Sequence, residues 1–181
     1  MTLISRTKLA AVAAAVMTLN PVAASAQQAC VTEDEVSAIA IYSMPSLVEA
    51  VRLRCQGELS PNGFLNRPNN SLKNRYATLQ TRVWPRAKSG LLKIFAGRTS
   101  AAQSQQSVEM IRSLPDDAVR PLVDALIVQE ASPKIDTKQC GRIERVIELA
   151  SPIDPEIAGN VLGAVIGLVN PKELPVCPRR S

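Results

Sequence analysis

Histidine is absent from this 181-residue chain, and its absence excludes several classes of enzyme. Without an imidazole there is no Ser-His-Asp triad, no Cys-His nucleophile and no His-ligated zinc site. Phosphate-binding glycine loops and the G-x-S-x-G motif are also missing, and Ser-x-x-Lys does not occur after residue 26. We therefore expect no cofactor and no metal ion, and the sequence favours a protein that is not an enzyme.

Aromatic residues are scarce, at 3% of the chain. A carbohydrate-active enzyme usually presents aromatic platforms, so this scarcity weakens the remaining enzymatic alternative, a hydrolase that works with carboxylates alone. The acids that are available in pairs are Glu33, Asp34, Glu35, Asp116, Asp117, Asp154 and Glu156. All of them fall at expected helix starts, where acids stabilise the helix dipole. We therefore favour a structural role for these carboxylates.

The first 26 residues have the pattern of a cleaved secretory signal peptide. Arg6 and Lys8 give it a positive start, an apolar stretch over 9–19 follows, and small residues precede an expected cleavage after Ala26. A membrane anchor is the alternative, but a spanning helix needs about 20 apolar residues. The apolar stretch is too short for that, so we expect an exported protein.

The remaining residues, 27–181, are enough for one helical domain with its own core. We expect this domain in a periplasm or outside the cell, with no further membrane span. Residues 57–70 are rich in Gly, Pro and Asn and are expected to form an internal loop. Cleavage would remove two basic residues and lower the formal net charge from +5 to +3. This modest charge and the expected compartment argue against nucleic acid as a partner.

All four cysteines lie after the expected cleavage site: Cys30, Cys55, Cys140 and Cys177. An even number of cysteines in an exported chain indicates disulfides. Their spacing contains no Cys-x-x-Cys pair and matches no zinc site. Of the three possible pairings we expect Cys30–Cys55 and Cys140–Cys177, because each would close a local helical hairpin.

Apolar spacing predicts an all-α fold, a compact array of about five to eight short helices without a sheet. Thr32 and Glu35 form a capping box that starts the first helix. We expect this helix to end before Pro45, since the residue preceding a proline resists the α conformation. A second capping box, Ser46 to Glu49, then predicts a new helix.

A longer helical pattern begins at Ser71. After Pro85 its apolar face resumes with Leu91 and Phe95, rotated by about a quarter turn. Pro85 therefore either kinks one helix or begins a second one. Further helices are expected over 100–114, 116–131, 136–150 and 154–169. Asp154 should cap the last of these, and Asn170-Pro171 should end it.

Acidic residues are absent from Leu59 to Val108. On a continuous helix, four basic residues of this stretch share one face: Arg75, Arg82, Arg86 and Lys93. Such a stripe suits binding to anionic lipid head groups, to other anionic envelope components or to an acidic protein. The simpler alternative is a solvated helix face whose acids come from neighbouring helices. The binding hypothesis predicts that the four side chains are exposed, without matching acids close by.

Gly159, Gly163 and Gly167 recur every four residues in the last predicted helix. Glycines at this spacing form a flat strip that lets another backbone approach closely. The strip is either a dimer seam or, as we favour, a surface packed against a neighbouring helix of the same domain. Each glycine in a helix interior costs about 1 kcal/mol relative to alanine, so close packing should offset that cost.

Four short motifs carry a resemblance to a known group of proteins. They are Tyr42-Ser43-Met44-Pro45 between Cys30 and Cys55, Trp84-Pro85-Arg86-Ala87, Leu114-Pro115-Asp116-Asp117-Ala118, and Cys140 followed by Ile143-Glu144-Arg145-Val146. In these motifs the chain resembles a group of small exported proteins of α-proteobacteria. The resemblance implies a periplasmic helical protein, and it assigns no activity and no site residues.

These observations favour an exported, non-enzymatic helical protein that binds a protein partner or an anionic envelope component. The alternative is a carboxylate-only hydrolase that acts on an envelope polymer. A concave pocket shared by two carboxyl groups is the feature that would distinguish the second from the first.

Overall fold

The structure is a computed structural model that describes residues 30–67, 71–98, 108–172, 174 and 176–178. Its helices are α2 (Glu33–Arg54), η1 (Phe64–Asn66), α3 (Ser71–Arg98), α5 (Asp116–Ala131), η2 (Ser132–Lys134), η3 (Thr137–Gln139), α6 (Cys140–Ala150) and α7 (Pro155–Val169). Residues 108–113 are also helical. The predicted all-α fold is confirmed, and within the described ranges the only β-type pairing is an isolated bridge between Val31 and Val176. The predicted signal peptide lies outside the described residues.

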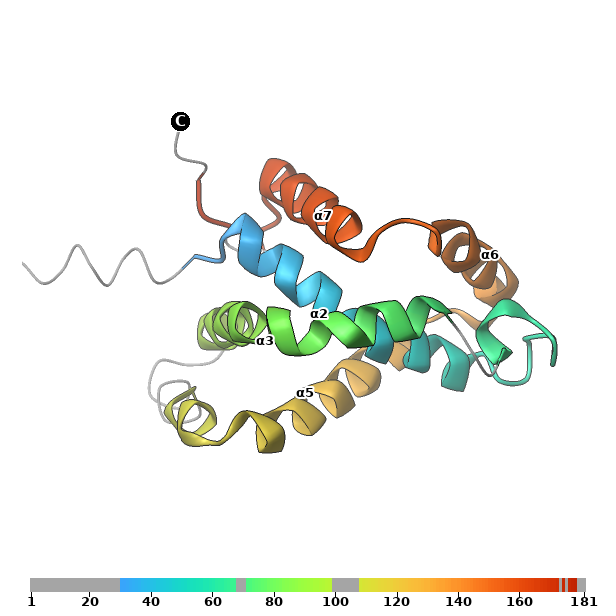
Figure 1. Cartoon of the computed structure of the whole chain (residues 1–181), viewed down its shortest axis with the longest axis horizontal. Helices are drawn as coiled ribbons and strands as arrows, with labels where there is room; N and C mark the ends of the chain where they lie inside the picture. Colours follow the sequence, from blue (N-terminus) through green and yellow to red (C-terminus); the bar gives the residue numbers. More distant parts are fainter. Residues whose placement is uncertain (1–29, 68–70, 99–107, 173, 175, 179–181) are drawn as a thin grey trace, which may run out of the picture.

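α2 is the central helix of the fold, with α7 on one side and α3 and α5 on the other (Figure 1). The predicted capping box begins it: the Thr32 hydroxyl accepts from the Glu35 N–H, and the Glu35 carboxylate accepts from the Thr32 N–H. Both pairs satisfy N–H groups that the first helical turn leaves without partners. α2 buries residues around much of its circumference, because it contacts three other helices.

Pro45 lies inside α2, so the predicted break before it and the new helix from Ser46 are wrong. A proline within a helix removes one N–H donor and crowds the preceding turn. Neighbouring helices bond to α2 on either side of this proline. Gln80 of α3 donates from Nε2 to the carbonyl oxygen of Tyr42 at 2.9 Å, and Ser46 donates from Oγ to the Asp124 carboxylate of α5 at 3.0 Å. Packing on all sides therefore outweighs the local preference of the sequence.

α3 passes through Pro85 as one helix, which decides between the two alternatives left by the sequence. Figure 1 shows its C-terminal part running in a different direction from its N-terminal part. Before the proline, Leu72 and Tyr76 belong to the buried cluster that α2 also joins. Beyond it, Leu91 and Phe95 face residues 108–114 and α5. The rotation of the apolar face in the sequence thus corresponds to a change of neighbour.

Trp84 and Tyr42 form the centre of the core, at 0% and 1% exposure, with ring centroids 4.8 Å apart. The Arg120 guanidinium of α5 lies 5.4 Å from the Trp84 ring centre, within the range of a cation–π contact. The Tyr42 hydroxyl donates to the Arg120 carbonyl oxygen at 3.4 Å. Burial, together with the nearby Asp124 carboxylate, raises the pKa of Tyr42 above its ordinary value. These contacts connect α2, α3 and α5 around one core.

α7 begins and ends where the sequence predicts. Asp154 caps it by accepting from the N–H groups of Glu156 and Ile157. Asn170 ends it in the left-handed conformation, at φ 42°. Asparagine tolerates this conformation better than other non-glycine residues, and it closes the helix before Pro171.

The two disulfides are Cys30–Cys177 and Cys55–Cys140, so all four cysteines are paired but the predicted partners are wrong. The expected Cys30–Cys55 bond required a hairpin between these residues. They are instead separated by the 22 residues of α2, about 33 Å of helix at 1.5 Å per residue. The actual bonds join segments far apart in sequence: one fastens the C-terminal tail to the start of α2, and the other fastens the end of α2 to α6. Disulfides of this kind are typical of oxidising compartments.

Among the described helices, α2 alone is long and apolar enough to cross a bilayer, judged by length and composition. Its position in the fold matches a core helix, because 56% of its most apolar window is buried inside the structure. The segment Thr137–Ala150 and α7 meet the same criterion only as a pair, across a bend of 114°.

Candidate functional site: an apolar cavity between α3 and α5

An apolar cavity of about 230 Å³ lies between the C-terminal half of α3, residues 108–114 and α5. Except for Lys88, every described residue that lines it is apolar: Trp84, Leu91, Leu92, Phe95, Val108, Ile111, Leu114, Val119, Leu122, Val123 and Leu126. A cavity with such a lining excludes strongly hydrated groups and favours hydrocarbon.

Helical spacing explains why these side chains meet. On α3 the lining positions begin at Trp84 and recur at intervals of three and four residues to Phe95, which places them on one face. On α5 the lining runs from Val119 to Leu126 with the same spacing. Two apolar helix faces therefore oppose each other, and residues 108–114 close a third side.

The cavity reaches the surface along α5. Leu122 and Leu126 line it, yet they keep exposed fractions of 59% and 46%. Val119 at the other end of this face is buried at 3%. The lining therefore runs from the core out to solvent, which gives a ligand a route of entry.

Lys88 is the one charged residue among the described residues that line the cavity. Its ammonium donates to the Asp116 carboxylate at 2.9 Å, and its side chain is only 17% exposed. The Trp84 indole N–H and the Lys88 ammonium hold the pKa of Asp116 below its ordinary value. The indole nitrogen is buried, and within the described ranges it has no hydrogen-bond partner, so its effect on the Asp116 pKa is that of a nearby N–H dipole without hydrogen-bond geometry.

A second, polar cavity of about 480 Å³ adjoins the apolar one. The two cavities share Lys88 and Leu92 in their walls. The other described residues that line the polar cavity are Pro85, Ser89, Lys93 and Arg112. None of these lining residues is acidic, so its charged side chains are all cationic.

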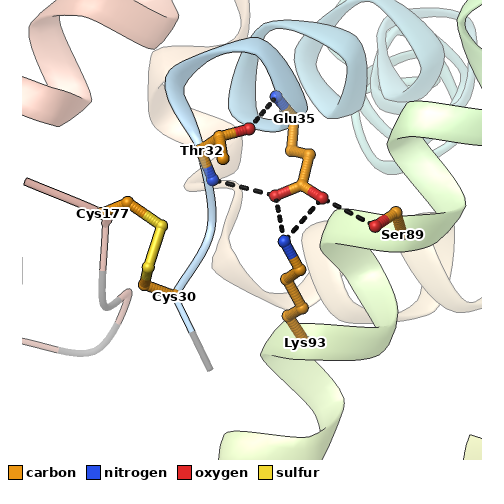
Figure 2. The surroundings of a disulfide bond; sticks show 6 residues. All are labelled: Cys30, Thr32, Glu35, Ser89, Lys93 and Cys177. Atoms are coloured by element: carbon orange, nitrogen blue, oxygen red, sulfur yellow. Dashed lines mark hydrogen bonds and ion pairs between the residues drawn. A yellow bond between two sulfur atoms is a disulfide. The ribbon is translucent and has the colours of Figure 1, made fainter. Parts of the chain in front are cut away.

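Lys93 belongs to a partly buried ionic cluster beside the Cys30–Cys177 disulfide (Figure 2). Its ammonium lies 2.8 Å from each carboxylate oxygen of Glu35, and Ser89 Oγ donates to the same carboxylate at 2.6 Å. Burial raises the pKa of Glu35, but the hydrogen bonds from Lys93, Ser89 and the Thr32 N–H outweigh burial and lower it. Glu35 therefore does two things: it caps α2 and fastens α2 to α3.

The predicted basic stripe is not an exposed face free of acids, and this expectation is wrong. Arg82 pairs with Glu156 of α7, and Lys93 pairs with Glu35 of α2. Arg75 donates to the carbonyl oxygens of Ser151 and Ile153, just after the end of α6. The acids missing locally are supplied by the first turns of two other helices. Arg86 is exposed and lines a different cavity.

The glycine strip of α7 packs against α2, as the packing interpretation expects. A Cβ atom added at Gly159 would lie 2.6 Å from the Ile41 side chain, and one at Gly163 would lie 2.6 Å from the carbonyl oxygen of Glu33. At Gly167 it would meet the Glu33 carboxylate at 2.6 Å. The strip therefore sets the distance between α7 and the central helix.

The opposite face of α7 is apolar and exposed. Its exposed residues are Ile157, Val161, Leu162, Val165, Leu168 and Val169. Apolar residues grouped on a surface are typical of contact sites. This face is separate from the cavity between α3 and α5.

Two carboxylates do share a concave site, as the hydrolase alternative requires. Asp34 and Glu156 line a cavity of about 220 Å³ together with Arg86, Ser37 and others. Both acids are exposed, and Glu156 is paired with Arg82. A general acid of the glycosidase type depends on burial in an apolar pocket to keep its proton. Neither acid has that environment. No group of three or more metal-ligating residues occurs within the described ranges.

Comparison of the chain with protein families, with curated proteins and with solved structures gives no match.

Proposed function

We propose that the protein is an exported, periplasmic binding protein without enzymatic activity, and that its apolar cavity holds the hydrocarbon part of a small envelope component. The observation that carries the proposal is the cavity itself: about 230 Å³ of space lined by apolar side chains from three segments. An engineered cavity of about 150 Å³ with such a lining binds benzene. The space here is larger, and it opens at Leu122 and Leu126.

An apolar void that stays empty forfeits contacts along its whole lining. A hydrocarbon ligand would restore those contacts, which is the physical reason for expecting one.

Three observations support the proposed location. The two disulfides suit an oxidising compartment, and residues 1–26 have the pattern of a signal peptide. The resemblance to small exported proteins of α-proteobacteria favours a periplasm. In that compartment the available hydrophobic molecules are components of the envelope.

The test uses Trp84, the only tryptophan of the chain, as a reporter in the cavity wall. The neutral probe N-phenyl-1-naphthylamine accepts energy from tryptophan and fluoresces in apolar surroundings. Added to the mature, disulfide-bonded protein, it should quench Trp84 and brighten with a saturable, one-to-one curve. Leu126→Phe, which adds bulk at the cavity mouth, should weaken binding at least about tenfold. The matched change Leu168→Phe, on the exposed face of α7, should leave it unchanged.

Two results would contradict the proposal. If the probe fails to saturate or leaves Trp84 unquenched, the cavity does not bind hydrocarbon. If Leu168→Phe weakens binding and Leu126→Phe does not, the exposed face of α7 is the binding surface, and a protein partner becomes the better hypothesis.

A further inference from the structure

The polar cavity beside the apolar one points to the chemical class of the ligand. We propose that the ligand is a single-chain anionic amphiphile, with its alkyl chain in the apolar cavity and its carboxylate or phosphate head group at Lys88, Lys93 and Arg112. This inference rests on the proposed function and specifies the ligand of the same site.

The position of the two cavities is the first argument. Lys88 and Leu92 stand in both walls, so the polar cavity lies directly beside the apolar one. The linings differ: the apolar cavity has a single charged residue among its described lining residues, whereas the polar cavity has three cations and Ser89 beside Pro85 and Leu92. An amphiphile has the same two parts side by side, an apolar chain and a charged head group.

Charge is the second argument. The cations of the polar cavity have acidic neighbours, namely Asp116 at Lys88, Glu35 at Lys93 and Glu109 at Arg112. Those acids are not among the residues that line the cavity, so its wall presents the cationic groups. An anionic head group meets attraction there, and a cationic one meets repulsion.

The reorganisation needed for binding is small. The Arg112–Glu109 pair joins atoms 3.7 Å apart on side chains that are 59% and 74% exposed. The Asp116 partner of Lys88 is 52% exposed. The exposed Arg112–Glu109 pair contributes little to stability, so Arg112 can turn to a ligand without weakening the fold. Lys88 is only 17% exposed and keeps its bond to Asp116, but an ammonium has three donors and can also donate to a head group. Lys93 stays on Glu35, whose charge opposes its own, so Lys88 and Arg112 supply most of the attraction.

The experiment compares four ten-carbon probes with the mature, disulfide-bonded protein, each below its micelle concentration: decanol, decanoate, decyl phosphate and decyltrimethylammonium. Binding is followed by Trp84 fluorescence and by calorimetry. At least one of the two anions should bind about tenfold tighter than decanol, as a charged hydrogen bond in a partly dry site allows. Decyltrimethylammonium should bind most weakly, and added salt should reduce the advantage of the anion.

Arg112→Gln should weaken the binding of the anionic probe until its affinity is close to that of decanol. The affinity for decanol itself should stay unchanged. The matched control is Arg145→Gln on α6, since Arg145 makes a similar exposed pair with Glu148 and lines neither cavity. This control should change nothing. The difference between decanoate and decyl phosphate identifies the head group, carboxylate or phosphate.

Failure of this inference and failure of the proposed function are distinguishable. If decanol, both anions and the cation bind equally, and Arg112→Gln has no effect, the anionic ligand class is overturned while hydrocarbon binding stands. If none of the four binds, the proposed function itself is overturned. Tighter binding of decyltrimethylammonium than of either anion would also overturn the inference.

Discussion

Gln80 of α3 donates its side-chain amide to the carbonyl oxygen of Tyr42 at 2.9 Å, three residues before Pro45 of the central helix. This bond joins α3 to α2 within one turn of the proline at which the sequence predicts the end of a helix. It also brings α3 against α2 at the level of the core aromatic pair, Tyr42 and Trp84.

Replacing Gln80 by alanine should therefore destabilise the fold. The Tyr42 carbonyl oxygen would lose the bond from the Gln80 side chain, and a hydrogen bond of this kind contributes about 0.5–1.5 kcal/mol. Urea unfolding followed by circular dichroism should give a lower free energy of unfolding with the same denaturant dependence. The control is Gln129→Ala, at an exposed position of α5, which should stay within about 0.5 kcal/mol of the parent. Equal effects of the two changes would show that the Gln80 bond contributes nothing.

Alanine at Gly163 should destabilise the packing of α7 on α2. The new Cβ would sit 2.6 Å from the Glu33 carbonyl oxygen, a backbone atom that cannot move aside cheaply. Overpacking of this kind costs about 1–3 kcal/mol. Gly141→Ala in α6 is the matched control, since nothing lies within 4 Å of its added Cβ. That change should be neutral or stabilise by up to about 1 kcal/mol, and thermal unfolding of the two variants should move in opposite directions.

Removing either disulfide should lower the free energy of unfolding. The loss should be larger than for the predicted Cys30–Cys55 and Cys140–Cys177 bonds, which would have closed shorter loops. The cysteines of the two bonds are 147 and 85 residues apart in sequence. For closed loops of this length the chain-entropy treatment gives about 4.5–5 kcal/mol each. The double variants Cys30→Ala/Cys177→Ala and Cys55→Ala/Cys140→Ala should unfold at clearly lower urea concentrations. Peptide mapping without reductant should recover Cys30 with Cys177, and recovery of Cys30 with Cys55 would contradict the fold.

Protonation of Glu35 should lower the free energy of unfolding in acid. Its pKa in the folded protein lies below the ordinary value of 4.5. This group therefore contributes stability that is fully present above about pH 4.5 and is lost as pH falls through the lower, folded-state pKa. Glu35→Gln should lower stability near neutral pH by about 1–3 kcal/mol, because Lys93 loses its partner, and should flatten the acid dependence. Glu130→Gln, at an exposed carboxylate, serves as the control. An unchanged acid slope in Glu35→Gln would assign the acid sensitivity to other groups.

The parts of the fold that depend on local chemistry could be predicted from the sequence. The Thr32 capping box and the cap residues Asp154 and Asn170 act within one or two turns of helix, and the structure confirms all three. The all-α class follows from apolar spacing, which is also local in origin. The glycine strip of α7 was expected to pack against a neighbour, and its spacing was enough to indicate that.

The parts that depend on tertiary contacts could not be predicted in this way. Pro45 remains inside α2 because that helix packs against α3, α5 and α7, and these contacts outweigh the local preference of the sequence. Once α2 is continuous, Cys30 and Cys55 lie at opposite ends of it, so one mistaken break also produced the wrong disulfides. The acids that pair with Arg82 and Lys93 lie on helices distant in sequence, and the pattern of one segment cannot reveal them.

The sequence indicates the cavity only in part. The apolar face of α3 rotates after Pro85, which shows that its second half meets a different neighbour. Spacing alone does not say whether two apolar faces close on each other or leave a gap, because the gap depends on side-chain volume and helix distance. Lys88 and Arg112 were likewise not singled out, since only the fold brings them to one wall.

The most direct test of the account is a crystal structure of the mature protein with 10-bromodecanoate, in which anomalous scattering locates the bromine. The account predicts one bromine peak between α3 and α5, in contact with lining residues such as Leu91 and Val123, and a carboxylate near Lys88. A bromine peak on the exposed face of α7, or an apolar cavity that stays empty at saturating ligand, would contradict it.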